Sequence, residues 1–251
     1  MTTPPLLVAI PRIPFPMGRK VLPVLALAFA VALAMALPLA DAAAGQATPA
    51  APAGPPMEDL GDGRALVGGI TVDRRAKSFS LPARVIRLAP PLEFLVVGPP
   101  WERAYESLLQ TEVLPVAFNL ACILIGLEAP PGAAPDAHFD PDVLEGPAVR
   151  LEVSWLVDGE VRRRPAAELL REAQRPAVTS DWVYVGSSFT PDGRFLAAMD
   201  GTLVGLVHAP ESIIEHRSGL GIGRYGSLAG DGGVAPPVGT AVTLHVTRLV
   251  P

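Results

Sequence analysis

The stretch from Leu114 to Leu127 places the strongest constraint on how this chain can fold. Asn119 is its only polar residue, Pro115 suits the first turn of a helix, and Gly126 suits the C-terminal end. A helix that is apolar on every side is buried in a protein core or in a membrane. Because a membrane span needs about 20 apolar residues, this stretch is too short to cross, and we expect it to pack against a sheet.

Most of the remaining domain carries strand signals. Apolar and polar residues alternate over Val149–Val157, and Asp158-Gly159 then favours a two-residue hairpin turn. Short helices are expected at Ala166–Ala173 and Pro210–Glu215. We therefore predict an α+β fold, in which a largely antiparallel β-sheet packs on one long buried helix with short accessory helices. The expected strands are 65–72, 78–88, 92–97, 149–157, 160–164, a meander of 182–189, 194–198 and 202–208, and 240–248.

The N-terminus has the composition of an export signal. Arg19-Lys20 precedes the uncharged apolar run Val21–Leu39, and Ala40–Ala42 then fits the small-x-small pattern of a cleavage site. We predict a signal peptide over residues 1–42, for which Met17 is the more ordinary start. An uncleaved anchor helix is the alternative, because the apolar run is long enough to span a bilayer. We expect an exported protein of the periplasm or cell envelope.

The rest of the chain divides into a tether and one domain. Residues 43–57 are rich in Ala and Pro and predict a linker, so a single domain is expected over residues 58–251. Residues 1–42 hold three basic residues and one acidic residue, which leaves 17 basic and 24 acidic residues and a net charge of −7. We expect no nucleic acid partner, because phosphate binding needs a basic face. Membrane contact is expected only through the N-terminal segment, if it stays uncleaved.

No residue pattern predicts a cofactor or a metal centre. Cys122 is the only cysteine, which excludes an intramolecular disulfide and a multi-cysteine zinc or iron–sulfur site. Asp136–Asp142 alternates possible ligands, but Pro141 and Pro147 stand where a calcium loop needs Gly and Glu. The segment is compatible only with a weak cation site on the surface. Gly221–Gly226 matches the letters of a dinucleotide-binding turn, but no helix is expected to follow it.

One segment, Trp101–Ser107, combines aromatic and charged side chains ahead of the apolar helix. Aromatic rings give contact area and charges give orientation, which is typical of a binding surface. The alternative is structural, with Trp101 and Tyr105 packed over a sheet edge and with Glu106 bracing the turn. His245 lies on the polar side of the last expected strand and is a further candidate. The candidate ligand-binding residues are Trp101, Arg103, Tyr105, Glu106, Ser107 and His245.

A catalytic use of Ser107 needs a base within hydrogen-bond reach and a third group that orients the base. The residues around Ser107 lack the Gly-x-Ser-x-Gly turn that presents a nucleophilic serine. The available bases are His138, His208, His216 and His245. We expect Glu106 and Ser107 to brace the turn instead of reacting.

Several short landmarks follow one another along the chain. They are Gly69–Asp73, Leu92–Val96, Tyr105–Leu109, Ile125–Leu127, Trp155 with Asp158-Gly159, Gly186–Phe189, Ile213–His216 and Pro236–Thr243. Taken in this order, they resemble the YdjY-type domain, a family of exported bacterial proteins. The resemblance covers roughly residues 60–250 and implies an exported domain whose biochemical role is not established. The family commonly has His-Glu-Ser where this chain has Tyr105-Glu106-Ser107, so a role that needs an imidazole is not expected at position 105.

These observations predict a non-catalytic binding or interaction module of the cell envelope. Its expected partner is a small molecule or an envelope protein. The first alternative is a hydrolase-like enzyme that uses Glu106 or Ser107 with a histidine. The second alternative is a structural envelope protein that self-associates through its apolar strands.

Overall fold

The structure is a computed structural model that describes residues 54–173 and 178–250. The predicted signal peptide and residues 43–53 of the predicted linker lie outside these ranges. In chain order the elements are β1 (Met57–Gly61), β2 (Arg64–Val67), β3 (Ile70–Asp73), β4 (Ser78–Val85), β5 (Phe94–Val97), the 3-10 helix η1 (Ala104–Glu106), β6 (Ser107–Gln110), α1 (Pro115–Leu124), β7 (Ala148–Val157), β8 (Glu160–Pro165), the 3-10 helix η2 (Ala166–Leu169), β9 (Leu170–Glu172), β10 (Trp182–Tyr184), α2 (Leu196–Asp200), β11 (Thr202–Gly205), β12 (Ile214–His216), β13 (Leu228–Gly230) and β14 (Ala241–Arg248).

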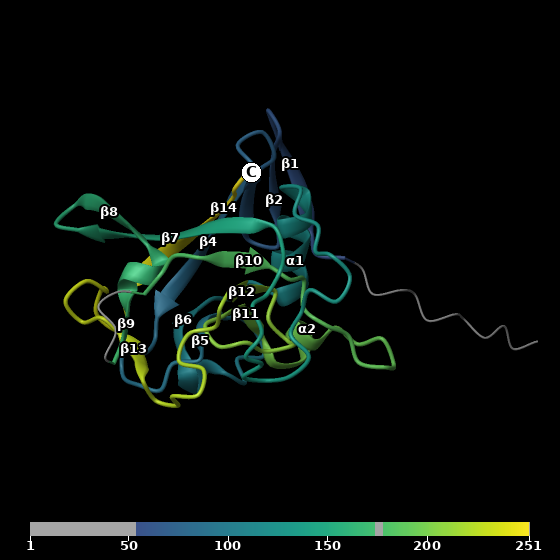
Figure 1. Ribbon diagram of the computed structural model, residues 1–251. Helices are drawn as coiled ribbons and strands as arrows, with labels where there is room; N and C mark the ends of the chain where they lie inside the picture. The colour runs from purple at the N-terminus through teal and green to yellow at the C-terminus, as the bar shows by residue number, and fades with distance from the viewer. Residues whose placement is uncertain (1–53, 174–177, 251) are drawn as a thin grey trace, which may run out of the picture. The chain divides into compact units, whose positions relative to one another are not determined.

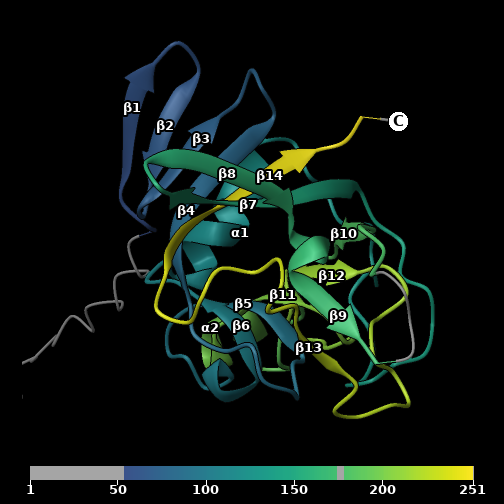
Figure 2. The ribbon, with the colours of Figure 1, turned by 90° about the vertical axis from the view of Figure 1, so that its left-hand side faces the viewer.

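Eight of these strands close into a barrel in the order β4-β14-β7-β10-β12-β11-β5-β6, and β6 pairs back onto β4 (Figures 1 and 2). The closing contact is short and pairs Arg84 with Gln110 and Val85 with Leu109. The β5–β6 and β11–β12 pairs are parallel, and the other pairs are antiparallel. Closure removes the exposed sheet edges that these eight strands would otherwise present.

The predicted α+β fold is therefore wrong. The protein is mostly β, with a closed eight-stranded barrel, two α-helices in the described part and 11% helix. The sequence pattern located most of the strands, but a repeat of two residues looks the same in an open sheet and in a barrel. The element that changes the architecture is β6, which begins at the last residue of the polar segment 101–107 and was not among the expected strands.

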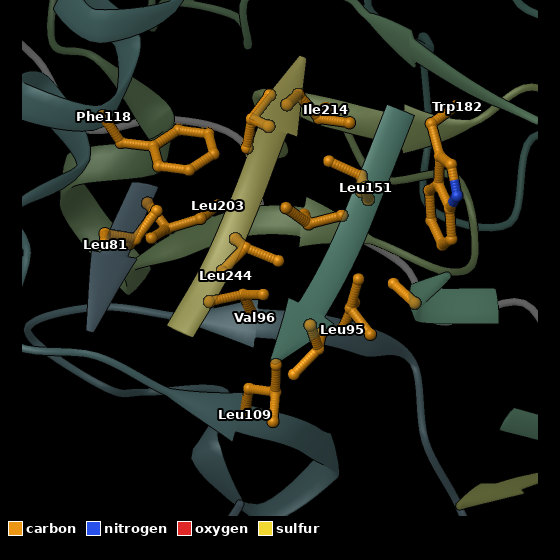
Figure 3. Close-up of a cluster of buried hydrophobic side chains, with 14 of the residues drawn as sticks. Leu81, Leu95, Val96, Leu109, Phe118, Leu151, Trp182, Leu203, Ile214 and Leu244 are labelled. Carbon is orange, nitrogen blue, oxygen red and sulfur yellow. The ribbon is translucent and has the colours of Figure 1, made fainter. Parts of the chain in front are cut away.

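The interior of the barrel is filled by side chains from strands that are far apart in the sequence. Figure 3 shows Leu81 of β4, Leu151 of β7 and Leu244 of β14 gathered in one cluster, and all three are buried. Phe118 of α1 joins this cluster and meets Phe79 edge-on, with ring centroids 5.3 Å apart. Burying such side chains removes apolar area from water, which is the main force that holds the barrel together.

The predicted helix is present as α1, but it is shorter and less buried than expected. Leu114 is its N-cap, Pro115 opens its first turn, and Gly126 follows its end with φ of 85°. One face contacts β2, β3 and β11. The other face exposes Val116 and Ile123, which are 46% and 51% accessible, so the helix packs against strands as expected but is buried on one face only. No helix in the described ranges has the length and hydropathy needed to cross a bilayer.

Other local predictions divide between success and failure. The hairpin at Asp158-Gly159 is confirmed, and both residues have positive φ as a turn of this kind requires. The helix expected at Ala166–Ala173 is a 3-10 turn followed by β9, and the strand expected at 194–198 is replaced by α2. The helix expected at Pro210–Glu215 is a turn that leads into β12. The expected meander is also wrong, because β11 pairs with β5 and runs parallel to β12.

Candidate functional site

The connection between β5 and β6 is held in a fixed shape by its own polar side chains. Trp101 has a positive φ of 63°, and its indole Nε1 donates to the Thr111 carbonyl at 3.0 Å. The Ser107 hydroxyl is buried and donates to the Arg103 carbonyl at 2.7 Å. These two bonds tie both ends of η1 to the barrel, so the Arg103 side chain leaves the connection from a defined position.

Arg103 is the centre of a group of charged residues that we name the charged cluster. Its guanidinium lies 3.2 Å from Glu106 Oε1, 3.6 Å from Asp200 Oδ2 and 3.4 Å from Glu211 Oε1. It also lies 5.8 Å from the centre of the Phe94 ring, which is cation–π range. The Arg103 side chain is 29% accessible, so the cluster is partly open to solvent. The charged cluster consists of Glu93, Arg103, Glu106, His138, Asp200 and Glu211.

Glu93 and His138 complete the cluster beside Phe94. Glu93 directly precedes β5, and its backbone N–H donates to the Glu106 carbonyl at 2.9 Å. His138 Nε2 lies 3.1 Å from Glu93 Oε2, a distance that fits an ion pair, although the angle is not that of an aligned hydrogen bond. The His138 ring stacks on Phe139 with centroids 4.3 Å apart. The contact with Glu93 raises the pKa of His138 despite its partial burial.

The carboxyl groups of the cluster are crowded, and their acidity reflects this. Burial raises the pKa of Glu106, and the nearby Glu93 carboxylate raises it further, against the opposing effects of Tyr105 and Arg103. Burial and the Glu211 carboxylate likewise raise the pKa of Asp200. Four carboxyl groups thus face one guanidinium and one imidazole. This excess of acidic groups favours the approach of a further positive charge.

The structure brings together only some of the residues that the sequence suggested. Arg103 and Glu106 pair directly, and the Tyr105 hydroxyl lies 3.5 Å from the Arg103 guanidinium. Trp101 and Ser107 hold the backbone of the turn through their hydrogen bonds to the carbonyls of Thr111 and Arg103. His245 lies apart on β14.

His245 belongs to a different environment on the barrel. Its Nε2 lies 2.8 Å from the Ser154 hydroxyl of the neighbouring strand β7. Burial lowers its pKa, and the nearby Arg163 lowers it further. His245 therefore shares no contact with the charged cluster among the interactions that the described residues make.

Four members of the cluster are not among the candidate ligand-binding residues predicted from the sequence. The sequence places Glu93 in an apolar strand, Asp200 in a turn and Glu211 in a short helix. His138 is predicted only as one of four possible bases for Ser107, within the acidic loop. The only signal in the sequence was a charged residue beside a buried strand or a Gly-containing turn. Such a signal is common on any surface, and the segments come together through the pairing of β5 with β6 and with β11, which lies far away in the sequence.

The groups considered for metal binding are used in other ways. In the described ranges no three His, Cys, Asp or Glu side chains are arranged to hold a metal ion. In the acidic loop, Asp140 accepts backbone N–H bonds from Asp136 at 3.3 Å and Asp142 at 3.0 Å. Gly221–Gly226 is followed by a turn and β13, so the helix that a dinucleotide site needs is not present there.

Beneath the loops near the cluster lies one buried acid, Glu215 of β12. Its Oε1 accepts the Ala209 N–H at 2.9 Å, and burial raises its pKa well above the ordinary value. A Cβ at position 205 would overlap this carboxyl group, so Gly205 leaves the space that Glu215 fills. Burial therefore favours the neutral form of this carboxyl group.

The fold and site define a closed β-barrel domain with a half-buried charged cluster next to the connection between β5 and β6. The family model for the YdjY domain matches residues 70–247, which include the barrel strands up to the penultimate residue of β14 and all six cluster residues, so the chain belongs to this family. The suspected YdjY-type resemblance is confirmed. The comparison with curated proteins and the comparison with solved structures gave no match.

Proposed function

We propose that the protein is a non-catalytic binding module of the periplasm or cell envelope, and that the charged cluster recognises a positively charged group of its partner. The partner is a small molecule or another envelope protein. One observation carries the proposal: four carboxyl groups converge on a partly open site where, among the residues that the structure describes, Arg103 and His138 are the only counter-charges.

The geometry suits recognition because the charged groups are already ordered. Arg103 is fixed by three carboxylates from different segments, so little side-chain entropy is lost when a ligand binds. Tyr105 is 60% accessible and places an aromatic ring at the edge of the cluster. An incoming ammonium or guanidinium group would meet carboxylates on one side and an aromatic face on the other.

Export is supported by the N-terminal sequence and by the family resemblance. The basic pair, the apolar run and the Ala-x-Ala site are the three parts of a signal peptide. Sequencing the N-terminus of the protein from fractionated cells tests this part of the proposal. We expect a periplasmic protein that begins at residue 43. An intact N-terminus in the cytoplasmic fraction would contradict export.

Site-specific photo-crosslinking tests the recognition surface. The crosslinking amino acid p-benzoylphenylalanine replaces Tyr105 at the edge of the cluster, or Tyr225, which is 74% accessible and outside it, as the control. We expect a defined adduct from position 105 and none from position 225. The same adducts from both positions, or no adduct from position 105, would count against the cluster as the recognition surface.

An acid–base enzyme is the second candidate, and the contact between Glu93 and His138 beside Glu106 is the observation that favours it. Ser107 gives no support as a nucleophile, because its hydroxyl is buried and bonded to a backbone carbonyl. A panel of p-nitrophenyl esters, phosphates and glycosides tests this candidate. Release of p-nitrophenol that Glu106→Gln abolishes would establish it, and equal release by both proteins would reject it.

A further inference from the structure

A pocket with a volume of 570 Å³ lies between the C-terminal end of α1, the segment 128–136 and the segment 184–188. None of the six residues of the charged cluster lines it, so it is a separate site. Its volume lies in the range of small-molecule pockets. We name it the α1 pocket.

The lining of the α1 pocket combines an apolar wall with acidic groups. Ile123 is 51% accessible and contributes apolar surface, and Leu127 and Val185 lie buried in the same wall. Glu128 and Asp136 are exposed carboxylates in the same lining, which includes no Lys, Arg or His. An apolar body with a positive charge matches this combination, whereas an anion would be repelled.

The backbone at Gly186 keeps the pocket open. Gly186 has φ of 80°, and a Cβ there would lie 3.3 Å from Ala129 Cβ and 3.5 Å from the Tyr184 hydroxyl. Both of these residues line the pocket. A side chain at position 186 would therefore fill space between two walls, and glycine leaves that space free.

The next residue, Ser187, supports the same backbone path. It has a positive φ of 63°, which is uncommon for a residue with a side chain. Its hydroxyl donates to the Glu211 carbonyl at 2.8 Å and accepts the Ala197 N–H at 3.2 Å. These bonds hold a conformation that is costly in isolation, and such conformations concentrate at functional sites.

A polar group in the wall also suits a donor ligand. The Tyr184 hydroxyl donates to Asn119 Oδ1 at 2.8 Å. Its single proton is used in this bond, so its oxygen can act only as an acceptor toward the pocket. This contact also explains Asn119, the one polar residue of the apolar helix.

We propose that the α1 pocket binds a small organic cation, with an ammonium group at Glu128 and Asp136 and an apolar body against the exposed side chain of Ile123. The ammonium N–H groups find two carboxylates and the Tyr184 oxygen as acceptors. This site is independent of the recognition proposed for the charged cluster.

Titration of the full-length protein with benzylammonium, followed by the amide NMR shifts, tests the proposal. We expect shifts in residues 123–136 and 184–188, and weaker binding of benzyl alcohol and phenylacetate, which have the same ring without the positive charge. Shifts confined to other segments, or phenylacetate binding as tightly as benzylammonium, would overturn it.

Two matched pairs of variants sharpen the test. Glu128→Gln with Asp136→Asn should weaken benzylammonium binding about five-fold, because two exposed ion pairs are lost. Glu112→Gln with Glu160→Gln removes two exposed charges outside the pocket and should leave the affinity unchanged. Equal affinities in the two double variants would overturn the proposal.

The second pair tests the cavity. Gly186→Ala should weaken binding, whereas Gly193→Ala, at a similar φ of 83° but with open space around its Cβ, should not. If Gly186→Ala fails to fold, the charge variants still decide, because their exposed side chains make no hydrogen bond that the described residues show. Unchanged binding in a folded Gly186→Ala protein would reject the cavity.

Discussion

Replacing Arg103 by methionine should destabilise the protein by about 2–3 kcal/mol at neutral pH. The substitution keeps an apolar stem over Phe94 but leaves Glu106, Asp200 and Glu211 without their shared cation. Breaking a buried ion pair costs about 3–5 kcal/mol, whereas an exposed pair contributes about 0–1 kcal/mol. The Arg103 side chain is 29% accessible and the Glu106 side chain 5%, so the expected loss lies between these limits.

The pH dependence separates charge from packing in this prediction. Burial raises the pKa of Glu106, so its ionised form opposes folding, and this effect appears as pH rises through the folded-state pKa. Removing Arg103 raises that pKa further. The difference in stability between wild type and variant should therefore be larger at about pH 7.5 than at about pH 4.5, because burial raises the pKa of Glu106 and of Asp200 and favours their protonation as pH falls.

Urea unfolding followed by tryptophan fluorescence measures this difference at both pH values. The control is Arg194→Met, because the Arg194–Asp192 pair spans 3.0 Å but both side chains are more than 60% accessible. The control should lose about 0.5 kcal/mol or less. An equal loss at both pH values in Arg103→Met would refute the electrostatic reasoning and assign the effect to packing.

Three further predictions concern the core and the buried groups. The wild-type protein should lose stability as pH rises, because burial raises the pKa of Glu215 and its ionisation opposes folding. Glu215→Gln should abolish this loss. Thermal unfolding from about pH 6 to pH 9 measures this, and parallel curves for wild type and variant would contradict it. Phe118→Ala should cost about 3–5 kcal/mol in urea unfolding, since the ring is fully buried, and a loss below about 1 kcal/mol would show that the site collapses. Cys122 should react with a thiol reagent only after unfolding, because it is buried and burial raises its pKa well above the ordinary value; rapid labelling of the folded protein would contradict this.

Local structure was predictable where a few neighbouring residues determine it. Pro115 and Gly126 marked the two ends of α1 to within two residues, and Asp158-Gly159 marked the hairpin. The architecture was not predictable in this way. The barrel closes through two residue pairs between β4 and β6, and nothing near Arg84 or Gln110 in the sequence specifies that contact.

The same limit explains which residues of the charged cluster could be predicted from the sequence. Arg103 and Glu106 are three residues apart, so a local reading could group them. Asp200 and Glu211 lie about a hundred residues away and reach Arg103 only because β11 pairs with β5. His138 reaches Glu93 from the loop between α1 and β7. Local patterns therefore identified the centre of the cluster but not the acids around it.

The most direct test of the central claim is the crosslinking yield at position 105. This yield is compared between the protein with the wild-type cluster and the double variant Asp200→Asn, Glu211→Gln. Both substitutions keep the size of the side chain and remove two of the carboxylates that face Arg103. If the cluster recognises a positively charged group, the yield should fall about ten-fold, as expected for a loss of about 1.4 kcal/mol. An unchanged yield of the same adduct would contradict the claim.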